Sequence, residues 1–174
     1  EFEGKKPNIE KGTFVFPTAD IIGNVTIGSN CYIGPGSVLR GDYGKIIIGS
    51  GCSIQENVVI HARPDEVTLI GNEVTLGHGC IIHNATLKDY SVVGMGAIVS
   101  DYVVLEEWAV LGEGGLARQG QKIQAGEIAV GIPAKVIGNI HNRMKIKEEL
   151  ILFKKKYIEM AARFSKTDAL KKIG

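Results

Sequence analysis

A six-residue period governs most of this chain and leaves few folds open to it. From Val15 to Leu116 an aliphatic residue recurs at about every sixth position and is often followed by glycine, as in IGSNCY, IGPGSV, IGSGCS and VGMGAI. The fifth position of each hexad is mostly small. A short strand that buries one branched side chain, followed by a turn with glycine or a small polar residue, explains this pattern. Because no hexad buries its apolar face alone, the coils must stack as a solenoid, and three hexads per coil give a prism with three parallel sheets.

The composition limits the partners and the compartment. The chain has 20 basic and 19 acidic residues, so its net charge of +1 gives no reason to expect a nucleic-acid or membrane-surface partner. No apolar run approaches the roughly 20 residues of a membrane helix. No signal peptide is visible at the start, where the lack of an initiator Met leaves room for an upstream piece. Three cysteines, an odd number, argue against a disulfide framework, and we expect a protein of the reducing cytoplasm.

The C-terminal part of the chain follows another pattern. Apolar residues recur there at spacings of three and four, which predicts one amphipathic helix that packs on the prism or on a neighbour. These residues are Met144, Leu150, Phe153, Tyr157, Ala161 and Phe164. The basic run 154–156 is expected to form a solvated face. We therefore expect two domains, a β-helix over residues 1–140 and a helix within 141–174, with a loop off the prism at 117–121 and an irregular last coil at 126–137.

The hexad count places two of the four histidines in one column. Every third hexad lies on the same face, so His61 and His83 stack one coil apart, with Arg40 one coil before them. Adjacent strands lie about 4.8 Å apart, and two imidazoles at that separation can reach one ion through bonds of about 2.1 Å. His78 lies around a corner, on the face that also contains Gln55. It can join the pair only from a neighbouring copy, and a threefold assembly would bring these two faces together.

The histidines and cysteines can also be interpreted without a metal site. A lone histidine is usually a surface or satisfied residue, and two can stack by chance. His141 lies outside the repeat and is expected to have no role in the site. The cysteines at positions 31, 52 and 80 share the small fifth position with Ser and Ala, so we expect them to fill corners rather than to bind metal.

Three motifs together carry a family resemblance. RGD at 40–42, IQENVVIH at 54–61 and GHGCIIH at 77–83 resemble the γ-class carbonic anhydrases, and the resemblance covers roughly residues 10–140. It implies an all-β fold, a left-handed parallel β-helix, and a homotrimer that binds zinc, or alternatively Fe²⁺, between its subunits. The implied metal ligands are His61, His78 and His83, two from one subunit and one from the next.

The same resemblance proposes three further site residues. Gln55 matches the family's glutamine that hydrogen-bonds the metal-bound water, while Arg40 and Asp42 match a pair at the subunit interface. We take these three as the catalytic candidates. Tyr43 replaces a glutamate of the family prototype, and the insertion after His61 is short, so no residue is assigned to proton transfer.

The predicted chemistry is the reversible hydration of CO2 to bicarbonate, a lyase reaction. Three neutral histidines leave one coordination position open, as in catalytic zinc sites, and zinc so bound lowers the pKa of its water toward about 7. The resulting hydroxide attacks CO2. Three alternatives remain open: hydrolysis of an acyl-CoA thioester by the same metal hydroxide, acyl transfer as in hexapeptide-repeat acyltransferases, to whose final coil GIPAK at 131–135 is similar, and a non-catalytic trimeric scaffold.

Overall fold

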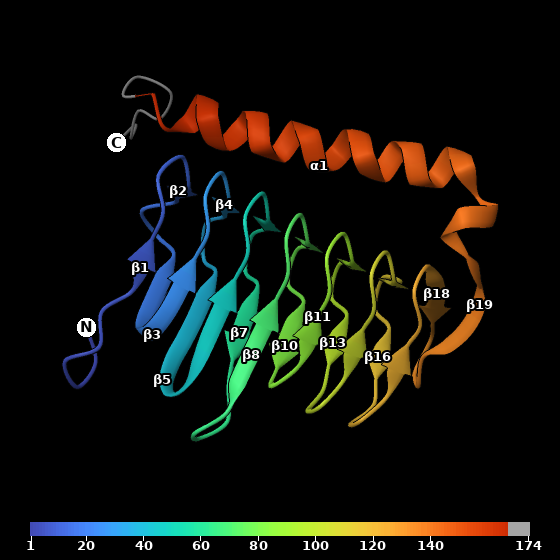
Figure 1. Ribbon diagram of the computed structural model, residues 1–174, viewed down its shortest axis with the longest axis horizontal. Helices are drawn as coiled ribbons and strands as arrows, with labels where there is room; N and C mark the ends of the chain where they lie inside the picture. Colours follow the sequence, from blue (N-terminus) through green and yellow to red (C-terminus); the bar gives the residue numbers. More distant parts are fainter. Residues whose placement is uncertain (167–174) are drawn as a thin grey trace.

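The protein is a parallel β-helix along which one long helix runs back from the last coil to the first (Figure 1). The computed structural model describes residues 1–166. Within that range the strands form two hydrogen-bonded sheets, one of eight strands and one of eleven. The solenoid expected from the six-residue period is therefore confirmed.

The eight-stranded sheet is one face of the prism. It is parallel except at its last pair, β18 and β19. Its strands are β2 (Phe14–Val15), β4 (Tyr32–Ile33), β6 (Ser53–Ile54), β9 (Thr75–Leu76), β12 (Val92–Val93), β15 (Val110–Leu111), β18 (Glu127–Val130) and β19 (Lys135–Asn139).

The eleven-stranded sheet comprises the other two faces. They are joined because the long strands β3 (Asp20–Ile27) and β5 (Val38–Ile48) continue from one face to the next. One face continues through β7 (Val59–His61), β10 (Ile81–His83), β13 (Ile98–Val99) and β16 (Leu116–Ala117). The other continues through β8 (Val67–Ile70), β11 (Thr86–Leu87), β14 (Val104–Leu105) and β17 (Lys122–Ile123), while β1 (Asn8–Ile9) pairs with β3.

The core is a set of aliphatic columns that run along the prism axis. Ile33, Ile54 and Leu76 are directly paired in successive coils of the eight-stranded sheet, and all three are fully buried. Each such side chain contributes about 1.5–3 kcal/mol through its removal from water. The same in-register stacking brings polar residues of equivalent hexad position together on the outside.

Glycine has two separate purposes in the repeat. At the second hexad position it permits close approach, since a Cβ on Gly94 would lie 2.5 Å from the backbone nitrogen of Glu113 in the next coil. At the fourth position the turn needs a positive φ, which is 67° at Gly79. Non-glycine residues adopt the same left-handed conformation elsewhere, such as Trp108 with a φ of 60°.

The prediction of a loop off the prism at 117–121 is wrong. Ala117 is fully buried and ends β16, which pairs with β13, and β17 pairs with β14. Residues 118–121 therefore form an ordinary turn within a regular coil. The repeat was concealed because Ala replaces the usual Ile, Leu or Val at the first hexad position. The irregular last coil is confirmed, since β18 and β19 pair antiparallel with a bulge.

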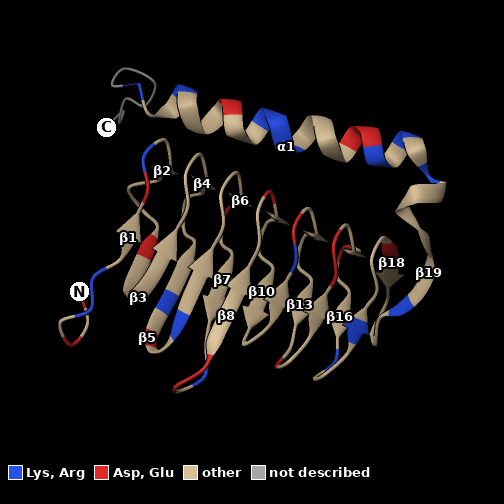
Figure 2. Ribbon diagram, viewed as in Figure 1, with Lys and Arg blue, Asp and Glu red and all other residues tan. Residues whose placement is uncertain are grey.

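A 3-10 turn (Ile140–Asn142) leads into the helix α1 (Met144–Phe164). The helix was expected within 141–174, and residues 167–174 of that range lie outside the described part of the chain. The helix covers the eight-stranded sheet, where Phe164 stacks on Phe14 with ring centroids 5.4 Å apart. One prediction for its faces is wrong, because Lys154, expected in a solvated run, is only 4% exposed, while Phe153 is 53% exposed in the single chain. Figure 2 shows acidic and basic residues interspersed along α1 and the turns. No helix within residues 1–166 is long and apolar enough to cross a bilayer.

Candidate metal centre

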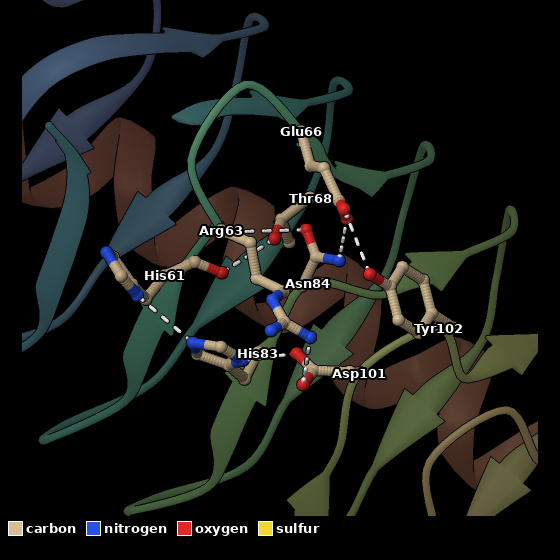
Figure 3. Close-up of polar contacts among 8 residues, drawn as sticks. All are labelled: His61, Arg63, Glu66, Thr68, His83, Asn84, Asp101 and Tyr102. Atoms are coloured by element: carbon tan, nitrogen blue, oxygen red, sulfur yellow. Dashed lines mark hydrogen bonds and ion pairs between the residues drawn. The ribbon is translucent and has the colours of Figure 1, made fainter. Parts of the chain in front are cut away.

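Two histidines face each other on the outside of the prism. His61 ends β7 and His83 ends β10, and the two residues are direct partners in the parallel sheet. Arg40 on β5 pairs with His61 one coil earlier, so the predicted column is confirmed. The two rings approach each other with His61 Nδ1 and His83 Nε2 3.1 Å apart (Figure 3).

The outer nitrogen of each ring contacts a carboxylate. Asp42 Oδ1 lies 3.1 Å from His61 Nε2, and Asp101 Oδ1 lies 2.5 Å from His83 Nδ1. When the ring N–H groups donate to these carboxylates, the two facing nitrogens both present lone pairs, an arrangement that a cation between them would satisfy. Their separation is close to the edge of about 3.4 Å in a tetrahedron with Zn–N bonds of about 2.1 Å. The donor set therefore fits a metal ion.

The electrostatics at His61 favour neutral imidazole next to the ionised Asp42 carboxylate. Burial acts to raise the pKa of Asp42, but hydrogen bonds from the Tyr43 backbone N–H, Arg40 and His61 together lower it to about 2. Burial lowers the pKa of His61, and the neighbouring Asp42 only partly opposes this. Neutral imidazole is the form that binds metal.

His78 occupies a corner of the prism, in the turn between β9 and β10. Its Nδ1 lies 2.5 Å from Glu56 Oε2, and the other oxygen of Glu56 accepts a hydrogen bond of 2.9 Å from the Tyr32 hydroxyl. The His78 side chain is 47% exposed. Across residues 1–166, no three His, Cys, Asp or Glu side chains lie close enough to share an ion. One chain thus brings His61 and His83 together but not His78.

Gln55 lies directly after β6, on the same face as His78, as expected. Both residues line a groove of about 340 Å³ between the eight-stranded sheet and α1, with Phe153 and Tyr157 on the helix side. Gln55 is only 7% exposed. Its side-chain amide forms no hydrogen bond among the residues that the structure describes, so it is available to a group in the groove. Because α1 covers the outer surface of this sheet, the open face expected to meet a neighbour is absent, and His78 lies half-exposed at the corner beside the groove.

The cysteines and His141 lie apart from the histidine pair. Cys31 and Cys52 fill a corner, where their sulfurs donate to the carbonyls of Gly49 and Gly71 at 3.1 and 3.0 Å. Cys80 is fully buried, and burial raises the pKa of its thiol to about 12. His141 lies in the turn before α1, 3.3 Å from Lys147 Nζ, and does not contact the histidine pair.

Sequence reasoning missed the carboxylates Glu56 and Asp101. Glu56 immediately follows Gln55 in the chain, and Asp101 occupies the third hexad position one coil after His83. A search for acids one coil from each histidine in the stacked alignment would have found both, Glu56 beside His78 and Asp101 beside His83.

Comparison with known proteins supports this description. A family model described as "Bacterial transferase hexapeptide (six repeats)" matches residues 6–41. "Gamma carbonic anhydrase 2, mitochondrial" of Arabidopsis thaliana is 40% identical over 166 residues, which is 90% of this chain and 58% of that protein. The chain therefore spans little more than half of that relative. "Carnitine operon protein CaiE" of Escherichia coli K12 is 33% identical over 139 residues, which is 80% of this chain and 71% of that protein.

Two solved structures extend the comparison to three dimensions. A hexapeptide transferase family protein from Anaplasma phagocytophilum shares 40% identity with a TM-score of 0.83, and the match covers 92% of this chain and 93% of that one. A putative acetyltransferase from Bacillus cereus shares 31% identity with a TM-score of 0.73 over 94% of each chain. Both match along the β-helix and most of the chain beyond it.

Proposed function

Because this chain belongs to the γ carbonic anhydrase-like members of the hexapeptide-repeat family, we propose that it is a metal-dependent lyase that reversibly hydrates CO2 to bicarbonate. The observation that carries the proposal is the pair of histidine nitrogens 3.1 Å apart, each ring held from behind by a carboxylate. Carboxylates in this position are typical of histidines that bind metal. The identity to the Arabidopsis protein named as a carbonic anhydrase supports the same reaction.

We place the complete site between subunits of a homotrimer. His61 and His83 would come from one copy and His78 from the next, because a corner separates His78 from the pair within one chain. Exposed aliphatic residues flank the histidine column, two residue positions earlier along the strands and therefore on the same outer side, and they offer an apolar contact surface next to the site. These residues are Val59, Ile81 and Ile98.

Each residue of the site then has a definite task. Three histidines would hold Zn²⁺ or Fe²⁺ with one position open, and the ion, when bound, supplies a water of pKa about 7 as the nucleophile. Gln55, buried and without a partner among residues 1–166, would orient the reacting oxygen by hydrogen bonding. Asp42 holds the His61 ring, and its ion pair with Arg40 keeps the carboxylate ionised.

Metal analysis of single and mixed variants tests the intersubunit site. His61→Ala and His78→Ala should each abolish bound zinc, whereas His141→Ala, the matched control, should retain it. If the two inactive variants are unfolded together and reassembled, random mixing restores about a quarter of the sites, since one subunit supplies the intact pair and the next supplies His78. Zinc retention by His78→Ala, or no restoration in mixed trimers, would contradict the interface arrangement.

The reaction itself is tested by stopped-flow CO2 hydration. We expect a rate above that of buffer for protein loaded with zinc or, without oxygen, with Fe²⁺, and a lower rate for Gln55→Ala at unchanged metal content. No rate above buffer with either metal would refute the proposed activity while leaving the metal site in place.

A second candidate is hydrolysis of an acyl-CoA thioester at the same site. The groove that Gln55 and His78 share with α1 has a volume of about 340 Å³, far more than CO2 needs, and several apolar side chains line it. Release of free thiol from a series of acyl-CoA esters, measured on the same zinc-loaded preparation, separates the two reactions. Phe153→Ala should weaken thioester hydrolysis and leave CO2 hydration unchanged if the groove binds an acyl chain.

A further inference from the structure

Asp101 contacts two different groups with its two oxygens. Oδ1 lies 2.5 Å from His83 Nδ1, and Oδ2 accepts a hydrogen bond of 3.2 Å from Arg63 Nη1 (Figure 3). Asp101 follows β13, so it reaches His83 from the next coil of the same face. Its position leaves His83 Nε2 as the nitrogen that points toward His61.

Arg63 lies in the loop that follows His61, and contacts with neighbouring residues hold it in place. Its backbone N–H donates to Asn84 Oδ1 at 3.4 Å, and the Asn84 amide donates to Glu66. Glu66 also accepts a hydrogen bond of 2.9 Å from the Tyr102 hydroxyl, and the guanidinium carbon of Arg63 lies 5.9 Å from the Tyr102 ring centroid. Asp101 thus connects this network to the side chain of His83.

We propose that Asp101 is a positioning residue for His83: it fixes the ring and the Nδ1–H tautomer so that Nε2 presents its lone pair to the metal. Arg63 keeps the carboxylate oriented for this contact. The inference rests on the proposed metal site and deepens it, because it assigns the ring nitrogen with which His83 binds. An imidazole without this acceptor rotates and distributes its proton over both nitrogens, and loss of such a partner typically lowers metal affinity about 10- to 100-fold.

The chain contains a closely matched control for Asp101. Asp89 also occupies the third hexad position before a tyrosine, and Tyr90 and Tyr102 have nearly equal φ values of 62° and 60°. Asp89 accepts hydrogen bonds from Asn72 at 2.8 and 3.3 Å and contacts no histidine. Asp89→Asn therefore reproduces the loss of a turn carboxylate without touching the site.

The first experiment measures zinc affinity by competition with a chelator for the full chain and the variants Asp101→Asn, Asp101→Ala and Asp89→Asn, with thermal unfolding as a check on folding. We expect Asp101→Ala to lose about 10- to 100-fold in affinity, Asp101→Asn to lose less, and Asp89→Asn to match the wild type. The visible spectrum of the Co²⁺-loaded protein should change in the Asp101 variants only. Wild-type zinc affinity in Asp101→Ala would overturn the proposal.

The second experiment works on the metal-free protein, so it remains informative if the proposed function fails. In protein labelled with ¹⁵N-histidine at pH 8, His83 should give the shifts of an Nδ1–H tautomer, and Asp101→Asn should move them toward a mixture. A wild-type His83 protonated at Nε2 would refute the role of Asp101 whether or not zinc binds. Conversely, absence of zinc binding by the wild type, with the expected tautomer present, would refute the metal site alone.

Discussion

Lys154 provides the clearest test of how α1 is attached to the prism. Its Nζ donates to the Glu73 carbonyl at 2.6 Å and to Thr75 Oγ1 at 3.2 Å, and the side chain is almost fully buried. Burial lowers the pKa of Lys154 from 10.5 to about 8, against the opposing effect of Cys52 and Glu73. This fall corresponds to about 3 kcal/mol by which folding disfavours the charged ammonium group.

The sign of the pH dependence follows from proton binding. Between about pH 8 and pH 10.4 the unfolded chain keeps the Lys154 proton while the folded protein releases it, so the free energy of unfolding rises with pH. Below pH 8 Lys154 is protonated in both states, so the free energy of unfolding no longer changes with pH through this group. We expect a gain of about 2–3 kcal/mol between pH 7 and pH 10. Burial raises the pKa values of Tyr32 and Tyr157, so their effect is opposite and begins near pH 10.

The test compares urea unfolding of wild type, Lys154→Met and Lys155→Met from pH 7 to pH 10 at one protein concentration in reductant. Methionine removes the buried charge and two hydrogen bonds of about 1 kcal/mol each. The free energy of unfolding of Lys154→Met should therefore equal or slightly exceed that of the wild type at pH 7 and fall below it at pH 10. It should not rise between these two pH values. Lys155 is exposed, so its variant should follow the wild type. An unchanged slope in Lys154→Met would refute the reasoning.

Two further predictions concern the repeat itself. Ile82→Ala should cost about 2–5 kcal/mol in urea unfolding because Ile82 is fully buried in the core. Ile81→Ala, one position away and exposed, should cost little in the isolated chain and should instead weaken the proposed trimer in sedimentation. Gly41→Ala should destabilise the protein and lower its zinc content because the new Cβ would lie 2.6 Å from the Asn24 carbonyl oxygen and displace the neighbouring carboxylate. Gly96→Ala has open space and should cost only about 1 kcal/mol of backbone strain, with full zinc content retained. Equal effects within either pair would contradict the assigned positions.

The fold was predictable because one short-range rule repeats many times. A hexad period determines which side chains face inward, and stacking in register then places His61 beside His83 without further information. The rule fails where its signal is weak. Ala117 occupies a core position with a residue that also suits a loop, and only the pairing of β16 with β13 reveals it.

The buried Lys154 could not be predicted for a different reason. Within the helix, three consecutive lysines indicate a solvated face, and helical periodicity says nothing of what lies beneath a particular turn. The Glu73 carbonyl at a corner of the prism lies there and accepts a hydrogen bond from the Lys154 ammonium group. The position of α1 over the eight-stranded sheet depends on tertiary packing, which helical periodicity does not contain.

The candidate site is best understood as one row that crosses four coils of the same face. Asp42, His61, His83 and Asp101 follow one another along the prism axis, each contacting the next, with the carboxylates at the two ends and the imidazoles between them. In-register strands lie about 4.8 Å apart, which is wider than the separation of about 3.4 Å between two nitrogens that share a tetrahedral ion. The rings must therefore lean toward each other, and the end carboxylates stabilise that lean because each can accept a hydrogen bond from the outer ring nitrogen. A substitution at one end should accordingly disturb the adjacent ring first, so Asp42→Asn should act on His61 and Asp101→Asn on His83.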